Sequence, residues 1–574
     1  MPCSRSIKWH TSIACRCTPA GPERIIIAHA LEDFPFDPTF PLTLPPQFSI
    51  AAMPYSVGLQ SAANAFLSAG FSTQFTLAVI AFLLIVFITS ALQKEGVDAP
   101  KSLPGNSLFH IVPFFRRRHQ FLKWGFDVTG ENVFQFNLLR NTVIVVSGEN
   151  ARQTFFTAKG LDLTEGFKIL SGAIPMVKGV TSDLQTRRIA LIHKRLANVQ
   201  RNASLSSLIP LLLQDARRMM EGWGSSGQLD PFENVYELLF QFTIRSLSCV
   251  EISDDPALVS RLKTLYDTLD TGTTPATVLL PWLPTPAMIQ KLWATKDIYE
   301  IVIKAINDRE KSGISRDDTL QMLLDSGDEK LVVVGFIMGL LIAGARATGT
   351  TASWLMTYLG GNQEWRLKAA AEVEALLASR SYSPLSSPTS TTSESPFSPI
   401  SPVSQSSLAA RLSAIPLEAW ENETPIMDAL IRETTRVAQP HTAMRRNLGP
   451  ELYINNKIIP TGAYVIYPFS DIHLNPDIYP DPWKFDPARK VPEHIPFAYA
   501  GWGGGKTTCL GTRLAKVELK LVTAMFVLGF QHSVVDRHGK PADPLPVPNW
   551  NDILLCRPPV GSFKLKYERT SAEL

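Results

Sequence analysis

Residues 500–511, AGWGGGKTTCLG, combine residue types and spacing that point directly to chemistry. Gly505, Lys506 and Thr507 end like a phosphate-binding loop, in which backbone N–H groups and a lysine hold phosphate oxygens. The same stretch places Cys509 in a glycine-rich turn before a predicted helix, where a thiolate is stabilised and can ligate a metal. One interpretation predicts a nucleotide-binding protein, the other a thiolate-ligated metal.

The sequence on either side of residues 500–511 does not fit a phosphate-binding loop. Such a loop follows a buried strand and is followed by a parallel sheet. Only 63 residues (574 minus 511) follow Gly511, too few for that sheet, and Ala500 stands where the first glycine belongs. The preceding segment contains Pro496 and lacks an apolar β-branched run. The sequence therefore favours the thiolate.

Two further clusters precede the cysteine. Glu433 and Arg436 stand three residues apart in a predicted helix, so they lie on one face and can form an ion pair. The segment 475–490, NPDIYPDPWKFDPARK, carries four prolines, which predict an irregular path ending near Arg489. Taken alone, the first pattern is common on protein surfaces, so its meaning depends on its neighbours.

In this order, the three clusters resemble the cytochrome P450 superfamily of haem-thiolate enzymes. The matching residues are Glu433 and Arg436 for the Glu-x-x-Arg helix, Phe485, Pro487 and Arg489 for the proline-rich segment, and Trp502, Gly505, Cys509 and Gly511 for the cysteine loop. The resemblance extends from a predicted membrane segment to the C-terminus. The conjunction of the three motifs is far more specific than any one of them.

The resemblance implies a haem b cofactor with Cys509 as the axial thiolate to iron. Trp502, Gly505 and Gly511 then shape the loop around the haem. Arg445 stands where relatives such as sterol 14-demethylases place a propionate-binding arginine. Thr507 replaces the usual arginine or histidine of the loop, with Lys506 beside it as a substitute cation. Glu433, Arg436 and Arg489 are expected to form a buried charge network that stabilises the loop.

The expected oxygen-activating motif departs from the family pattern. The family has [AG]-G-x-[DE]-T, and this chain has Ala-Gly-Ala-Arg-Ala-Thr at 343–348. In strict register Arg346 replaces the acid and Ala347 the threonine. Gly344 is the candidate for opening the oxygen groove and Thr348 for the catalytic hydroxyl. No register supplies a carboxylate.

These residues must be positioned by a mainly helical fold with small β-sheets, an α+β fold of the P450 type. Strands are predicted around 132–148 with a turn near 140–141, helices through 182–311, and a long apolar helix over 331–359. A hairpin is predicted around Asn455 and Asn456. Residues 381–407, nearly all Ser, Thr and Pro, are predicted to be a disordered insertion.

An uncharged apolar run over 75–92 predicts one transmembrane helix. Basic residues follow it, including the run at 116–118, so the C-terminal bulk is expected in the cytosol, as in a single-pass protein of the endoplasmic reticulum. The expected organisation is an extension at 1–52, disordered or outside the native start, an anchor over 53–94, a proline-rich hinge over 95–120, and the haem-thiolate domain over 121–574.

The amino-acid composition limits the classes of protein to which this chain can belong. The chain is 45% hydrophobic and 19% charged, which allows a large core, and its formal charge of +3 does not indicate nucleic-acid binding. Six irregularly spaced cysteines do not predict a disulfide framework, and no paired-cysteine or HExxH zinc motif is present.

The resemblance implies a membrane-bound monooxygenase that inserts one atom of O2 into a lipophilic molecule such as a terpenoid, sterol or polyketide. Electrons are expected from NADPH through a separate flavoprotein reductase, with Lys506 and Arg513 as candidate docking residues. Secondary metabolism is favoured over sterol 14-demethylation. The missing acid keeps open an isomerase or dehydratase acting on a peroxide, and a non-catalytic haem-binding adaptor is the third alternative. Residues 166–183 are the predicted substrate loop.

Overall fold

The structure is a computed structural model that describes residues 76, 98–170, 186–381, 407–553, 555–570 and 573–574. Internal contacts divide the chain after Ile85, and the second unit, Val86–Leu574, is the one described below. The predicted extension, the predicted membrane helix apart from Thr76, most of the predicted substrate loop and the Ser/Pro insertion between 382 and 406 lie outside the described residues.

Helices make up most of the described fold. They are α3 (Ser107–Arg116), α4 (Arg118–Thr129), α5 (Glu149–Thr157), α6 (Leu163–Leu170), α7 (Thr186–Val199), α8 (Asn202–Gly222), α9 (Tyr236–Leu247), α10 (Val250–Ser253), α11 (Pro256–Thr271), α12 (Pro275–Leu279), α13 (Pro286–Ser312), α14 (Thr319–Asp325), α15 (Lys330–Gly361), α16 (Gln363–Ser381), α17 (Leu408–Ser413), α18 (Leu417–Asn422), α19 (Pro425–Val437), α20 (Ser470–His473) and α21 (Thr512–Gly529). Two single turns, η1 (Pro231–Val235) and η2 (Gly505–Thr507), complete them.

The strands form small sheets, the largest ordered β1-β2-β3-β9-β6-β4. Its members are β1 (Lys101–Ser102), β2 (Val133–Leu138), β3 (Asn141–Val146), β4 (Leu161–Asp162), β6 (Thr442–Asn447) and β9 (Tyr464–Pro468). A second sheet contains β10 (Phe530–Asp536), β11 (Phe563–Arg569) and β5 (Ser226–Leu229), and the third is the hairpin of β7 (Leu452–Ile454) and β8 (Lys457–Ile459).

Both predicted hairpins are present. β2 and β3 pair antiparallel, and the turn falls at Leu139 and Arg140, one residue earlier than predicted. Asn455 and Asn456 join β7 to β8, with φ of 49° and 62°. Two successive positive φ values match a two-residue hairpin turn, in which asparagine is favoured.

The long apolar helix is confirmed as α15, which packs against α9, α19 and α21. Among the described helices it alone is long and apolar enough to cross a membrane, and half of its most apolar window is buried in the fold. An apolar surface nearly all round fits a helix that other elements cover on several sides.

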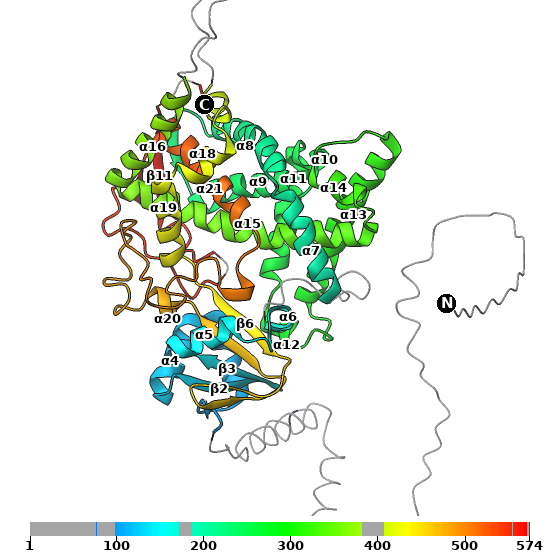
Figure 1. Cartoon of the computed structure of the whole chain (residues 1–574), viewed down its shortest axis with the longest axis vertical. Coiled ribbons are helices and arrows are strands. Elements are labelled where there is room, and N and C mark those ends of the chain that lie inside the picture. The colour runs from blue at the N-terminus through cyan, green and yellow to red at the C-terminus, as the bar shows by residue number, and fades with distance from the viewer. Residues whose placement is uncertain (1–75, 77–97, 171–185, 382–406, 554, 571–572) are drawn as a thin grey trace, which may run out of the picture. The chain divides into compact units, whose positions relative to one another are not determined.

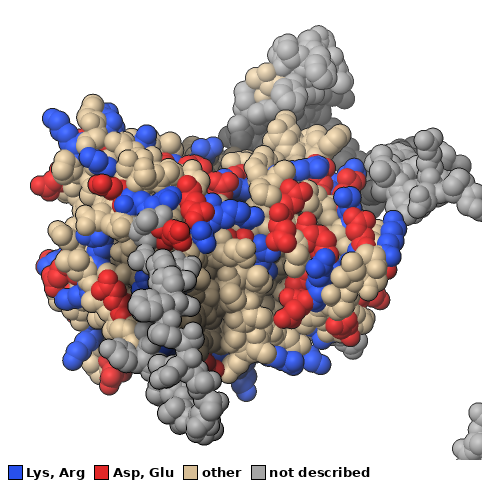
Figure 2. Space-filling model, turned by 90° about the horizontal axis from the view of Figure 1, so that it is seen from above, with Lys and Arg blue, Asp and Glu red and all other residues tan. Residues whose placement is uncertain are grey.

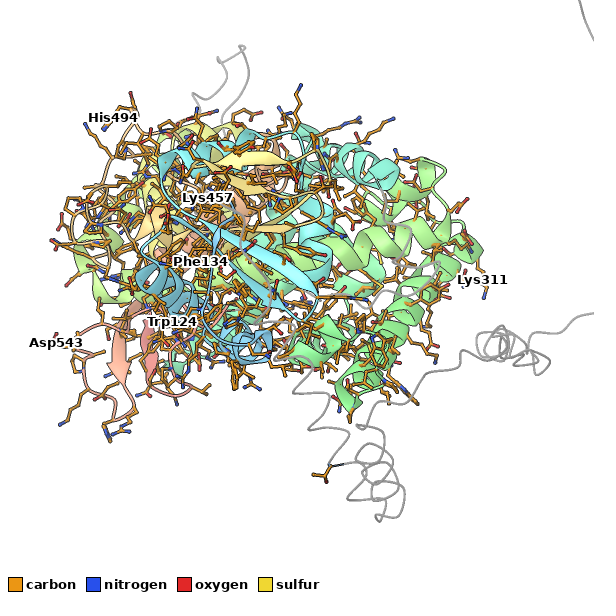
Figure 3. The ribbon with its side chains drawn as sticks, turned by 90° about the horizontal axis from the view of Figure 1, so that it is seen from below. Trp124, Phe134, Lys311, Lys457, His494 and Asp543 are labelled. Carbon is orange, nitrogen blue, oxygen red and sulfur yellow. The ribbon has the colours of Figure 1, made fainter. Side chains whose placement is uncertain are left out.

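Figure 1 shows the six-stranded sheet at one end of this unit, with α4 and α5 beside it, and the helices around α15 away from it, together with β11 of the second sheet. At the sheet end, Phe134 of β2 packs edge-to-face against Phe126 of α4, with ring centroids 4.9 Å apart. Figure 3 labels Phe134 and also Trp124, which belongs to α4. On the face in Figure 2, Lys and Arg side chains are interspersed with Asp and Glu.

Candidate active site

The cysteine loop, residues 500–511, leads directly into α21. The backbone N–H of Cys509 donates to the carbonyl of Trp502 at 2.7 Å. Cys509 is exposed, whereas the other cysteines of the described part, Cys249 and Cys556, are buried. Because α21 begins at Thr512, the thiol lies just before a helix N-terminus, where a negative charge is stabilised.

Two glycines give the loop its shape. Gly505 has φ of +57°, and a Cβ there would lie 2.3 Å from the carbonyl oxygen of Phe156 in α5. Gly503 has φ of +77°, and a Cβ there would lie 2.7 Å from the carbonyl oxygen of Thr507. Any other residue would be strained in conformation and would clash with backbone, so these positions require glycine.

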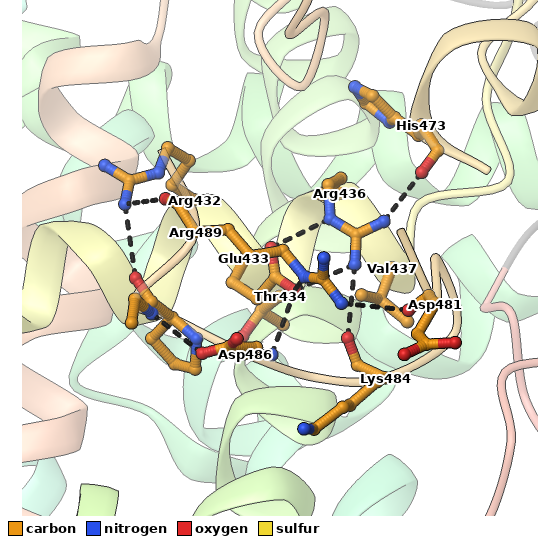
Figure 4. Close-up of polar contacts among 12 residues, drawn as sticks. Arg432, Glu433, Thr434, Arg436, Val437, His473, Asp481, Lys484, Asp486 and Arg489 are labelled. Atoms are coloured by element: carbon orange, nitrogen blue, oxygen red, sulfur yellow. Dashed lines mark hydrogen bonds and ion pairs between the residues drawn. The ribbon is translucent and has the colours of Figure 1, made fainter. Parts of the chain in front are cut away.

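The predicted Glu433–Arg436 pair is present and buried in α19 (Figure 4). Arg436 donates through Nε and Nη2 to the two carboxylate oxygens of Glu433, both at 2.8 Å. Arg489 Nε lies 3.4 Å from Glu433 Oε1, and the Arg489 guanidinium donates to the carbonyls of Pro480 and Asp481. The three charged residues named from sequence are therefore brought together.

This charge network is linked to the cysteine loop through His473. Arg436 Nη1 donates to the His473 carbonyl at 2.6 Å, and His473 Nε2 accepts from the backbone N–H of Ala500 at 3.0 Å. Burial, assisted by the charge of Arg436, lowers the pKa of His473 to about 3. The ring therefore stays neutral, which keeps Nε2 available as an acceptor.

Arg445 approaches the cysteine loop from β6. Its Nη2 donates to Thr507 Oγ1 at 2.5 Å and its Nη1 to the Met444 carbonyl at 2.8 Å, while the guanidinium lies over the ring of Phe155. Arg445 is 4% exposed, and burial lowers its pKa to about 10. No carboxylate of the described residues lies within ion-pair distance of it. A buried cation beside Thr507 is suited to an anionic group bound near Cys509.

The remaining predicted loop residues differ in setting. Lys506 is exposed, Trp502 packs at the edge of the largest core cluster, and Gly511 is the N-cap of α21 with open space around it. Arg513, a candidate reductase contact, donates instead to Glu421 and to the Gln200 carbonyl within the fold.

On α15, Gly344 lies toward α9, because a Cβ there would lie 3.2 Å from the Thr243 side chain. Thr348 follows four residues later and is buried on the same side of the helix. Ala343 and Ala347 are exposed, and Thr351 is partly exposed, as are Ile342, Gly344 and Arg346. Ala343, Ala347 and Thr351 recur every four residues, and we call these three the exposed stripe. The roles predicted for Gly344 and Thr348 stay predictions, and Thr351 is a second hydroxyl to consider.

The structure also shows relationships that sequence reasoning missed. The Arg445–Thr507 bond joins positions 62 residues apart, and the His473–Ala500 bond spans 27. Arg346, in the position of the family's acid, pairs with Asp270 of α11. None of these residues forms a local motif with its partner, so no sequence signal could have identified the pairs.

Comparisons with known proteins agree with this geometry. The family model for cytochrome P450 matches residues 418–563, which include α19, the cysteine loop and α21. Cytochrome P450 monooxygenase AacuE of Aspergillus aculeatus is 24% identical over 481 residues, covering 81% of this chain and 91% of the relative. Cytochrome P450 monooxygenase dmxR5 of a Cryptosporiopsis species is 26% identical with the same coverage. Lanosterol 14-alpha demethylase of Mus musculus is 26% identical, covering 77% of this chain and 84% of the relative.

Among solved structures, retinoic acid bound cyanobacterial CYP120A1 is similar with a TM-score of 0.61 and 21% identity. The match covers 83% of this chain and all of that one, so the two share a fold. Together with the family model and the curated relatives, this agrees with the order of the charge network, the cysteine loop and α21. The chain belongs to the cytochrome P450 superfamily and is an oxidoreductase enzyme.

Proposed function

We propose that the protein is a membrane-anchored haem-thiolate monooxygenase that inserts one oxygen atom of O2 into a lipophilic small molecule. The observation that carries this proposal is the pairing of an exposed Cys509, presented by a glycine turn, with a buried Arg445 that contacts the same loop. A porphyrin with anionic propionates and an iron open to a thiolate fits both features.

Cys509 would ligate the haem iron through its thiolate, and Arg445 would bind a propionate of the haem. Lys506, exposed beside Thr507, is the second proposed propionate cation, and Trp502, Gly505 and Gly511 contribute the shape of the loop. When bound, the haem supplies dioxygen activation, which the thiolate favours by donating electron density. The Glu433–Arg436–Arg489 network positions the loop through His473 and Ala500 and takes no part in the chemistry.

Hydroxylation of a C–H bond by O2 consumes two electrons and two protons and releases one water molecule. We propose that the electrons come from NADPH through a separate flavoprotein reductase. Because the substrate is expected to be lipophilic, fungal secondary metabolism, including terpenoid biosynthesis, is the favoured setting. The relatives AacuE and dmxR5, both named as cytochrome P450 monooxygenases and both from fungi, support the monooxygenase activity.

The decisive experiment is a carbon-monoxide difference spectrum of the reduced full-length protein. We expect the absorption band of a thiolate-ligated haem in the wild type and its loss in Cys509→Ala. Cys249→Ala removes a buried thiol elsewhere and should keep the band. A Cys509→Ala protein with an unchanged spectrum would show that the thiolate assignment is wrong.

The arrangement on α15 favours one second candidate, an isomerase or dehydratase acting on a hydroperoxide. Arg346 replaces the acid and Ala347 lies on the exposed stripe where the family has its hydroxyl, so the usual proton-transfer groups are absent from these positions. Turnover of a lipid hydroperoxide without reductase or NADPH would favour this candidate. Turnover that requires both would favour the monooxygenase.

Anchoring at 75–92 in the endoplasmic reticulum, with the catalytic part in the cytosol, completes the proposal. The Asn-x-Ser/Thr sequences at Asn202 and Asn422 offer a topology test because glycosylation occurs only in the lumen. We expect the protein in the microsomal fraction with neither asparagine modified. Glycosylation at either site would reverse the proposed orientation.

A further inference from the structure

Among the arginines buried in the described part of the chain, all but two have carboxylate partners. Among the residues that the structure describes, the arginines classed as buried are Arg118, Arg152, Arg195, Arg245, Arg309, Arg436 and Arg445. The paired ones are Arg152 with Asp471, Arg195 with Asp328, Arg245 with Asp215, Arg309 with Asp318 and Arg436 with Glu433. Arg118 and Arg445 have no such partner among the described residues. Burying an unpaired charge is costly, so both positions suit an anion that is not part of the described protein.

Arg118 is the less expected of the two. It is the first residue of α4 and is only 5% exposed. Its Nε donates to the Phe114 carbonyl at 3.2 Å, and its guanidinium lies over the Phe114 ring, 4.3 Å from the centroid. These neutral contacts leave the charge uncompensated, and a cation at a helix N-terminus also opposes the helix dipole.

The preceding arginines show that this burial is specific. Arg116 and Arg117 complete the basic run that sequence reasoning assigned to membrane orientation, and both are exposed. The third member of the run points inward instead. Arg117 thus offers a matched control, since it carries the same charge in the adjacent position.

His441 connects the two unpaired arginines. It lies in the segment between α19 and β6, four residues before Arg445. Burial, then the charge of Arg445, then that of Arg118 lower the pKa of His441 to about 4, so both cations are its electrostatic neighbours. The residue is nevertheless exposed. As a neutral imidazole near both guanidinium groups, the side chain of this exposed residue can donate one N–H to a bound ligand.

We propose that Arg118 and His441 bind a carboxylate, in addition to the one that Arg445 is proposed to hold at the cysteine loop. A guanidinium offers two parallel N–H donors that match a carboxylate, and the neutral imidazole offers a third. The carboxylate belongs either to a lipophilic acid that serves as substrate or to the second propionate of the haem. In the first case the inference deepens the proposed function by assigning it an acidic substrate class.

The test compares Arg118→Leu with Arg117→Leu in the full-length protein. Two quantities are measured: the rate at which haem is lost to apomyoglobin, and the dissociation constants of laurate and 1-dodecanol by calorimetry. If the carboxylate is the substrate's, Arg118→Leu weakens laurate binding about tenfold or more, leaves dodecanol binding unchanged and retains haem. If it is a propionate, Arg118→Leu speeds haem loss about tenfold and leaves the laurate-to-dodecanol ratio as in the wild type.

Arg118→Lys and His441→Gln protect the test against a variant that fails to fold. The lysine keeps the charge and loses the two-pronged geometry, so it should shift the same quantity in the same direction by a smaller factor. The proposal is overturned if Arg118→Leu matches Arg117→Leu both in the rate of haem loss and in ligand binding. It is also overturned if Arg118→Lys and His441→Gln both do so. Ligand binding is measured by calorimetry and does not depend on the carbon-monoxide spectrum. A wild-type protein that lacks the carbon-monoxide band would therefore refute the proposed function without deciding the role of Arg118.

Discussion

Arg346 of α15 and Asp270 of α11 form an ion pair, with Nε to Oδ2 at 3.0 Å and a second contact between Nη2 and Oδ1. The side chains are 23% and 21% exposed. Residue 346 occupies the position of the family's acid, so a carboxylate is present next to this position but is supplied by another helix. The pair ties α11 to α15 one residue before Ala347 of the exposed stripe.

Breaking this pair should destabilise the fold modestly, since both groups retain contact with solvent. We expect Arg346→Ala and Asp270→Ala each to lower the free energy of unfolding by about 1 kcal/mol, and the double variant to lose less than the sum. The exchange Arg346→Asp with Asp270→Arg should recover part of the loss. Strictly additive losses in chemical denaturation would show that the two side chains do not interact in solution.

Substitutions in the buried Glu433–Arg436–Arg489 network should lower the free energy of unfolding much more than those in the Arg346–Asp270 pair. Glu433→Gln leaves Arg436 and Arg489 without their shared carboxylate in a buried setting (Figure 4). We expect a loss of about 3–5 kcal/mol in unfolding free energy, together with lower haem content because His473 and Ala500 link the network to the cysteine loop.

The control for that prediction is Glu300→Gln, which removes an exposed pairing with Lys296 on α13. Exposed pairs of this spacing are screened by solvent and contribute little to the fold. Equal melting curves for Glu433→Gln and Glu300→Gln would show that the buried network contributes little to the fold.

Patterns confined to a few neighbouring residues were readable from sequence. Glu433 and Arg436 lie on one helix face by spacing alone, and the Asn455–Asn456 turn has a strong hairpin preference. Interactions between distant segments were not. Arg118 stands in a run of three arginines, and nothing in that run distinguishes the buried member from the exposed ones. Arg346 lies 76 residues from Asp270, so the identity of its partner depends on how the helices pack.

The orientation of α15 is a case where sequence gave no answer, because a helix that is apolar nearly all round has no face marked for the interior. The motif alone left Thr348 as the candidate hydroxyl. In the structure Gly344 and Thr348 lie toward α9, while Thr351 continues the exposed stripe and donates its hydroxyl to the Ala347 carbonyl at 2.8 Å.

The different settings of Thr348 and Thr351 predict which of the two hydroxyl groups affects the coupling of NADPH oxidation to product formation. With reductase and NADPH present, we expect Thr351→Val to increase the share of NADPH oxidation that ends in released hydrogen peroxide, because a hydroxyl on the exposed stripe is removed. Thr348→Val keeps side-chain volume and should leave that share unchanged. The reverse outcome would return the catalytic hydroxyl to Thr348.

Stability should also depend on pH through a buried carboxyl group of α21. Glu518 is 3% exposed, and its side chain contacts the Ser246 hydroxyl at 3.0 Å. Burial, opposed in part by that hydrogen bond, raises its pKa from the ordinary 4.5 to about 8. The folded protein therefore favours the protonated acid, whereas the unfolded chain releases the proton above pH 4.5. The contribution of Glu518 is least unfavourable below pH 4.5 and becomes more unfavourable as the pH rises to about 8.

Replacing Glu518 by Gln removes this dependence while keeping the size of the side chain. We expect Glu518→Gln to match the wild type near pH 4 and to be more stable by about 3 kcal/mol at pH 7, with most of the difference developing between pH 4.5 and 8. Glu568→Gln, an exposed acid on β11, is the control and should show no such trend. Chemical denaturation at several pH values measures the difference, and a gap between Glu518→Gln and wild type that does not change with pH would mean that Glu518 is ionised inside the fold. A carboxylate held there would then need a compensating cation, which none of the described contacts of Glu518 provides.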